Sequence, residues 1–132
     1  MHILDELQAR GMIHQMTHET ELKALLSEGS TAFYVGFDPT AKSLHIGSLV
    51  PMMAMAFLQR AGHRPIALVG GATGMVGDPS GRSSERNLQG PEQIEENLQG
   101  MRQQLQQFLR FEGENAAELV NNADWTAKIS YI

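Results

Sequence analysis

Two stretches of helical periodicity open the chain. Apolar residues recur three and four positions apart from Ile3 onward, and Gly11 is expected to end this first helix. A second helix is expected to begin at Thr17, a residue type that caps helix N-termini well, and to end at Gly29. The pattern therefore predicts one or two short helices over residues 1–30, before any strand.

The hydrophobic period changes after these helices. Thr31–Phe37 is rich in aromatic and β-branched residues and predicts a buried strand. An apolar segment from Ile46 to Ala61 contains good helix formers, and Ile66–Val69 is a second short apolar run without alternation. Runs of that kind are typical of parallel strands covered on both faces. Strand, helix and strand in this order predict a βαβ unit, and hence an α/β fold with a parallel sheet and flanking helices.

The rest of the chain continues the alternation. Gly70–Gly81 is a glycine-rich stretch that predicts a long loop, and Pro91 suits the first turn of the next helix. An apolar stripe along that helix recurs at steps of four and three: Ile94, Leu98, Met101, Leu105 and Phe108. Leu119-Val120 predicts a third strand, and Asp124 is expected to cap a further helix. So few strands and helices predict the front part of a larger domain.

Composition and charge exclude several classes of protein. The 132 residues are 42% hydrophobic and 19% charged, which is typical of a globular domain. The absence of cysteine excludes disulfide frameworks, thiolate metal sites and cysteine nucleophiles. A net charge of -5 argues against nucleic-acid binding over the whole surface. No apolar run approaches the ~20 residues of a membrane span, and no signal peptide is evident, so we expect a cytoplasmic protein that does not enter a membrane.

Candidate chemistry gathers where the predicted strands end. Ligands of open α/β sheets bind beyond the carboxyl ends of the strands, and the start of a following helix favours phosphate. Residues with suitable chemistry at that edge are Tyr34, Asp38, Thr40, His45, Gly47, Ser48 and Asp78. Each also has an ordinary structural interpretation, because Tyr34 could belong to the core, His45 could be solvated and Asp78 could form a turn. Neither the G-x-G-x-x-G pattern nor the Walker pattern with its lysine is present.

Other polar residues give weaker indications. Arg82 and Arg86 lie four positions apart in a polar stretch, where they could be solvated or could contact phosphate. The remaining histidines have no partner pattern and are interpreted as surface residues: His2, His14, His18 and His63. No pair of residues has the spacing of metal ligands, so we predict no metal site. The eight methionines are interpreted as core filler.

Two long blocks of sequence resemble the bacterial tyrosyl-tRNA synthetase family. The first block is Tyr34–Ala41 followed by Ser43–Leu49, and the second is Ala61–Gly74 continuing through Gly77–Ser80. Asn121–Trp125 resembles a later stretch of the same family. The likeness covers nearly all of the chain, and the two blocks at this separation are a specific combination.

The resemblance implies the N-terminal part of a Rossmann-like class I synthetase catalytic domain. Residues 1–30 would form an N-terminal helical segment, and residues 31–132 the first, incomplete part of the nucleotide- and tyrosine-binding domain. The complete enzyme would activate tyrosine with ATP to tyrosyl-adenylate and transfer the tyrosyl group to tRNA(Tyr). It would form a homodimer and bind no cofactor of its own, with Mg²⁺ accompanying ATP. The main tRNA contacts would lie in parts beyond these residues.

The resemblance also implies roles for single residues. Tyr34 would bond the substrate phenol and Asp78 the substrate ammonium, while Gly36 and Asp38 would line the pocket, Asp38 on the nucleotide side. The residues implied to contact or stabilise the phosphates and the leaving pyrophosphate are Thr40, His45, Gly47, Ser48, Arg82 and Arg86.

Two departures from the family pattern qualify this expectation. Ser48 stands where the family often has a second histidine; serine can still donate a hydrogen bond, but it reaches less far. The lysine-rich signature Lys-Met-Ser-Lys-Ser is absent, which predicts a fragment that is inactive alone. Two alternatives stay open at this point: a small nucleotidyltransferase of the His-x-Gly-His type, and a non-catalytic synthetase paralogue.

Overall fold

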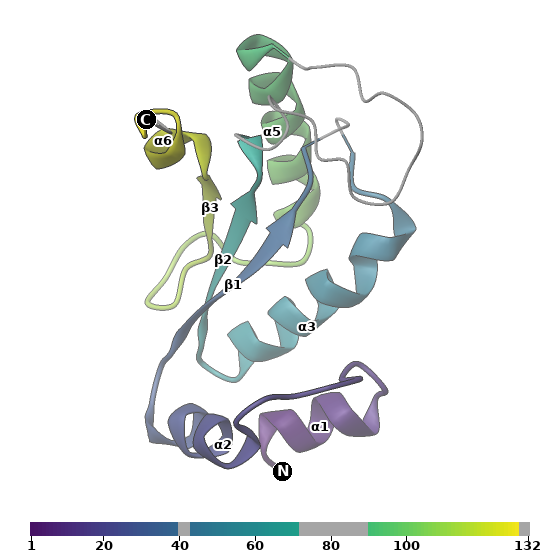
Figure 1. Cartoon of the computed structure of the whole chain (residues 1–132). Coiled ribbons are helices and arrows are strands. Elements are labelled where there is room, and N and C mark those ends of the chain that lie inside the picture. Colours follow the sequence, from purple (N-terminus) through teal and green to yellow (C-terminus); the bar gives the residue numbers. More distant parts are fainter. Residues whose placement is uncertain (40–42, 72–89, 130–132) are drawn as a thin grey trace.

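Three parallel strands form the centre of the molecule (Figure 1). The computed structural model describes residues 1–39, 43–71 and 90–129. The strands are β1 (Ala32–Phe37), β2 (Arg64–Val69) and β3 (Glu118–Asn121), and they lie in the order β1-β2-β3. Both neighbouring pairs run parallel, with Phe37 opposite Val69 and Val69 opposite Asn121. The predicted βαβ unit and parallel sheet are therefore confirmed.

The helices of the described residues pack against one face of the sheet or lie near its ends. They are α1 (Ile3–Ala9), α2 (Glu19–Glu28), η1 (Ile46–Ser48), α3 (Leu49–Arg60), α5 (Pro91–Leu105) and α6 (Ala123–Thr126). Figure 1 shows α1 and α2 beyond the amino ends of the strands, and α6 near the carboxyl end of β3. The guanidinium of Arg10 lies 4.5 Å from the centroid of the Phe57 ring, so the end of α1 packs on α3.

Two predicted helix caps were wrong. The N-cap of α2 is His18, in the left-handed conformation at φ 51° and ψ 45°, because the helix begins two residues after Thr17. The N-cap of α6 is Asn122, so Asp124 falls in the first turn of that helix instead of before it. A carboxylate in a first turn still interacts favourably with the positive end of the helix dipole.

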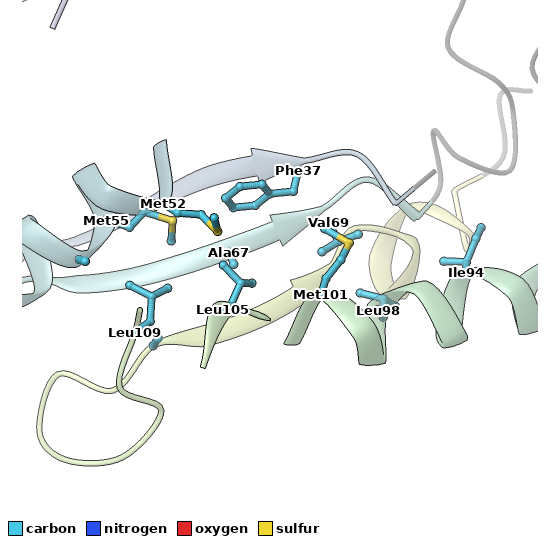
Figure 2. Close-up of a cluster of buried hydrophobic side chains, with 12 residues drawn as sticks. Phe37, Met52, Met55, Ala67, Val69, Ile94, Leu98, Met101, Leu105 and Leu109 are labelled. Carbon is cyan, nitrogen blue, oxygen red and sulfur yellow. The ribbon is translucent and has the colours of Figure 1, made fainter. Parts of the chain in front are cut away.

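A single apolar cluster joins α3 and α5 to one face of the sheet (Figure 2). Strand residues alternate between faces, and Phe37, Ala67 and Val69 all point into this cluster. The helices add most of the remaining buried side chains: Met52, Met55, Ala56, Ile94, Leu98, Met101 and Leu105. The prediction of methionine as core filler is thus confirmed for these three methionines and was wrong for Met1, which is exposed at the N-terminus. Phe108 was wrongly placed on the apolar stripe; α5 ends at Leu105, and the Phe108 side chain is 36% exposed.

The opposite face of the sheet is open along β1. Ala32, Tyr34 and Gly36 are exposed there, and Tyr34 retains 69% of its accessible surface. On β2, the residues facing the same way, Ile66 and Leu68, are half-buried. The prediction of a buried strand over Thr31–Phe37 was therefore wrong for this face of β1, because the described helices that build the core all stand on the other side.

A buried polar cluster fastens the end of α3 to the segment that follows α5. The side-chain amide of Gln59 donates to the Arg110 carbonyl at 2.7 Å and accepts from the Arg110 N–H at 2.9 Å. The Asn115 amide donates to the carbonyls of Gln59 and His63, at 2.7 and 3.1 Å. These hydrogen bonds form one network between residues that are 51 to 56 positions apart in the sequence. The network lies far from the carboxyl ends of the strands.

Two histidines expected at the surface have structural positions instead. His63 is only 2% exposed, and its Nδ1 accepts a hydrogen bond from the Thr31 N–H at 3.3 Å. Burial lowers the pKa of His63, and the nearby charge of His2 lowers it further. His2 is half-buried and caps α1, since its Nδ1 accepts from the Leu4 N–H at 3.1 Å.

No helix within residues 1–39, 43–71 and 90–129 is long and apolar enough to cross a membrane.

Candidate functional site

The carboxyl ends of the three strands meet at one edge. The Gly70 N–H donates to the Phe37 carbonyl at 3.0 Å, and the Asn122 N–H donates to the Val69 carbonyl at 3.0 Å. The strand pairing therefore continues for one residue past the end of each ladder. Asp38, which is exposed, comes directly after β1 at this edge. The expected meeting of the strand ends is confirmed for the described residues, whereas Thr40, Asp78, Arg82 and Arg86 lie outside them.

β1 places Tyr34 and Gly36 side by side on the open face. They are two residues apart in an extended strand, so both point away from the apolar cluster. A Cβ atom built on Gly36 would meet nothing within 4 Å, which leaves space in front of the strand. The interpretation of Tyr34 as a core residue was wrong, because its ring stands in this open space.

His45 begins the helical segment that follows β1. Its backbone is extended, and its Nδ1 accepts a hydrogen bond from the Gly47 N–H at 3.0 Å, so it is the N-cap of η1. A nitrogen that accepts from a backbone N–H carries no proton of its own. The neutral imidazole must then carry its proton on Nε2, which makes the exposed edge of His45 a hydrogen-bond donor.

Gly47 leaves room for the ring of His45 in its capping position. A Cβ atom at Gly47 would lie 2.8 Å from Cε1 and 2.9 Å from Nδ1 of that ring, closer than side chains tolerate. The glycine therefore lets the imidazole fold back over the helix start. The helical segment expected from Ile46 begins as the three-residue 3₁₀ turn η1 before α3. Within that turn Ser48 is buried while His45 is exposed, and the Ser48 N–H donates to the His45 carbonyl at 2.9 Å.

Two amides of α5 hold the chain on either side of this region, and neither was singled out from the sequence. Asn97 is 1% exposed, and its Nδ2 donates to the carbonyl of the buried Pro39 at 2.6 Å. The Oε1 of Gln104 accepts from the Leu44 N–H at 2.6 Å. A signal was present in the sequence, because Asn97 sits three residues after Ile94 and four before Met101, on the apolar side of the helix.

Close packing also marks the ends of β2 and β3. The Asn121 Oδ1 accepts from the Ala123 N–H at 3.0 Å, which turns the chain into α6. A Cβ atom on Gly71 would come within 2.7 Å of the Asn121 Cγ, so only glycine fits there without a shift. Within the described ranges, no group of three or more His, Cys, Asp or Glu side chains could hold a metal ion.

Comparison with known proteins identifies the family. A model of the family described as class I tRNA synthetases (W and Y) matches residues 26–132. The chain belongs to this family. The predicted resemblance to class I synthetases is confirmed, and family membership decides against the small nucleotidyltransferase.

Individual relatives agree with this assignment. The chain is 54% identical over 132 residues to a tyrosine–tRNA ligase of Desulfosudis oleivorans, and the match covers 100% of this chain and 30% of the relative. It is 51% identical over 130 residues to a tyrosine–tRNA ligase of Rhodopirellula baltica, with 98% of this chain and 30% of that protein covered. The chain thus spans about a third of the length of these curated relatives.

A solved structure shows the same fold. The C-terminally truncated mitochondrial tyrosyl-tRNA synthetase of Aspergillus nidulans superposes with a TM-score of 0.79 at 30% sequence identity. The match covers 98% of this chain and 39% of the other. The predicted Rossmann-like α/β fold of a class I synthetase is therefore confirmed for these residues.

Proposed function

We propose that these residues are the ATP- and tyrosine-binding part of a tyrosine–tRNA ligase, which activates tyrosine with ATP and transfers it to tRNA(Tyr). The observation that carries the proposal is the 54% identity to a tyrosine–tRNA ligase along the whole chain. The family includes both tryptophan and tyrosine enzymes, and these relatives favour tyrosine. Cytoplasmic location, homodimer formation and the boundary between residues 1–30 and 31–132 stay predictions.

The tyrosine subsite is proposed at the open face of β1. Tyr34 presents a phenol there, and the bare backbone of Gly36 leaves room for a ring beside it. A site built to bond a phenol rejects phenylalanine, because its own polar groups would then lose their partner; tyrosyl-tRNA synthetases are themselves the standard example of this selectivity. Asp78 is proposed to bind the substrate ammonium, on the strength of the sequence resemblance alone.

The phosphate subsite is proposed at the start of η1. In the activation step, a carboxylate oxygen of tyrosine attacks the α-phosphorus of ATP, and the bond to the pyrophosphate oxygen breaks. Negative charge builds on the α-phosphate and the leaving group, so placed donors lower the barrier most. The Nε2–H of His45 is such a donor, since its Nδ1 is held by Gly47. No covalent bond to the protein is needed.

Other residues complete this proposal. Ser48 and the backbone at Gly47 lie on the same turn as His45, and Asp38 lies at the adjacent strand end. Thr40, Arg82 and Arg86 are proposed to contact the phosphates by resemblance. Mg²⁺ would enter as part of the ATP substrate and neutralise some of the phosphate charge.

The test is amino-acid-dependent exchange of labelled pyrophosphate into ATP by the complete gene product that contains this sequence. We expect exchange with tyrosine, a far lower rate with tryptophan or phenylalanine, and charging of tRNA(Tyr). Exchange that depends on tryptophan would overturn the choice of substrate. A well-folded product without any exchange would identify a non-catalytic paralogue instead.

A further inference from the structure

We propose that Asn97 and Gln104 of α5 are positioning residues that set His45 and η1 against the end of β1. The two amides hold the chain at Pro39, just after β1, and at Leu44, just before His45. The effect on catalysis rests on the proposed function, whereas the anchoring itself does not.

The first anchor is a buried hydrogen bond of fixed direction. The Pro39 carbonyl can only accept, so the Asn97 atom that faces it at 2.6 Å must be the Nδ2 donor. The Oδ1 of Asn97 accepts in turn from the Gln93 Nε2 at 3.1 Å, which keeps the amide in this orientation. With both Asn97 and Pro39 buried, water cannot replace the bond if it is lost.

The second anchor has the opposite polarity. The Leu44 backbone N–H can only donate, so the Gln104 atom at 2.6 Å must be the Oε1 acceptor. Leu44 also packs against the apolar cluster, and the next residue is His45. The Gln104 bond therefore fixes the direction in which the chain enters η1.

Both anchors stand on one rigid element. Asn97 and Gln104 are about two helical turns apart, which brings them to the same side of α5. That helix is held by buried apolar residues, of which Met101 and Leu105 are fully buried (Figure 2). A functional group supported from a packed helix is placed more precisely than one supported from a loop. The neighbouring Gln103 is exposed and serves as a matched control.

The opposite polarities give a sharp test in the complete gene product. Asn97→Asp replaces the donor with an oxygen that repels the Pro39 carbonyl, whereas Gln104→Glu keeps an acceptor for Leu44. Gln104→Leu removes that acceptor. We expect Asn97→Asp and Gln104→Leu to slow tyrosine activation at saturating substrates by about tenfold or more, because small displacements of a catalytic group are costly. Gln104→Glu and the control Gln103→Glu should stay within about twofold of the wild type, because neither breaks an anchor.

The amplitude of the burst of adenylate formation gives the concentration of active sites. Rates are divided by this concentration, so that a variant with less folded protein is not scored as a slower enzyme. Hydrogen exchange of the backbone amides of residues 44–48 gives a readout without catalysis. Exchange should be faster in Asn97→Asp and Gln104→Leu, and unchanged in the two glutamate variants at 103 and 104.

The outcomes separate the two proposals. A wild type without pyrophosphate exchange would end the proposed function, while the amide exchange would still decide the anchoring. Equal damage by Gln104→Glu and Gln104→Leu, or wild-type rates and protection in Gln104→Leu, would overturn the positioning role. If Asn97→Asp does not fold, the Gln104 pair decides the question by itself.

Discussion

His45 performs two hydrogen-bonding tasks with one ring. Its Nδ1 caps the η1 turn by accepting from the Gly47 N–H. Its Nε2 carries the ring proton and can donate a hydrogen bond to a phosphate oxygen. Ser48, by contrast, is buried in the same turn. The two residues three positions apart are therefore unequal, although both were predicted to face the same phosphate.

This inequality predicts different costs of removal in the complete enzyme. Ser48→Ala should slow tyrosine activation by about two- to tenfold, the equivalent of one neutral hydrogen bond. His45→Ala should cost more, because it removes the donor and also uncaps η1. Single-turnover rates at saturating tyrosine and ATP measure both. Equal damage by the two variants would make Ser48 a full partner in the reaction.

His63 predicts a dependence of stability on pH. Burial lowers the pKa of His63 in the folded protein below the ordinary 6.5. The unfolded chain therefore binds a proton more readily, so the contribution of His63 is complete above about pH 6.5 and is lost as pH falls toward the lowered pKa. Urea unfolding between pH 7.5 and 5 should show a steeper loss of stability for wild type than for His63→Gln, whose amide oxygen can still accept from Thr31.

The exposed His14 provides the control for this measurement. His14→Gln should leave the slope of stability against pH as it is in the wild type. Parallel slopes for wild type and His63→Gln would show that another group carries the acid sensitivity.

At the level of elements, the chain pattern predicted which helices and strands exist. Strong periodicity marked α5, and the apolar runs at β1 and β2 pointed to strands where the structure has them. The pattern could not show which face each strand would bury, because an apolar run does not state where the helices pack. It also gave no sign that Gln59 and Asn115 would meet, since partners so distant in sequence leave no spacing to recognise.

The polar cluster around Gln59 predicts a large mutational effect between elements. Gln59→Leu preserves most of the side-chain volume but removes the Gln59 partner of the Arg110 N–H and of the Asn115 carbonyl. The Arg110 carbonyl keeps its hydrogen bond from the Ala117 N–H at 2.8 Å. We expect a loss of about 2–4 kcal/mol in the free energy of unfolding, because each unsatisfied buried group costs about 1–3 kcal/mol. Chemical denaturation of the complete protein measures this.

Gln107→Leu is the matched control for this unfolding measurement, because Gln107 is exposed in the segment that follows α5. Its free energy of unfolding should stay within about 0.5 kcal/mol of the wild type. Similar values for Gln59→Leu and Gln107→Leu would mean that water or a rearranged amide satisfies the freed groups.

At the scale of the whole molecule, the share of the relatives' length that this chain covers decides what activity we expect of it. The chain covers 30% of the length of its relative from Desulfosudis oleivorans, and the β1 face that carries Tyr34 is open. We therefore predict that residues 1–132 alone do not catalyse tyrosine-dependent pyrophosphate exchange, even where the complete gene product does. A rate near that of the complete product would show that these residues contain a whole activation site. Circular dichroism must first show that the shorter polypeptide is folded.

The arrangement of the core also sets an order for assembly during synthesis. β1, α3 and β2 come from one uninterrupted stretch, so their mutual pairing needs only short loops to close. Yet Met101 and Leu105, which complete the cluster beneath this unit, lie on α5 and leave the ribosome later. The nascent sheet therefore spends part of its translation with apolar side chains uncovered on the part of its face that α5 later covers. That interval is when a chaperone would have the most to bind, and slow codons placed before α5 would lengthen it.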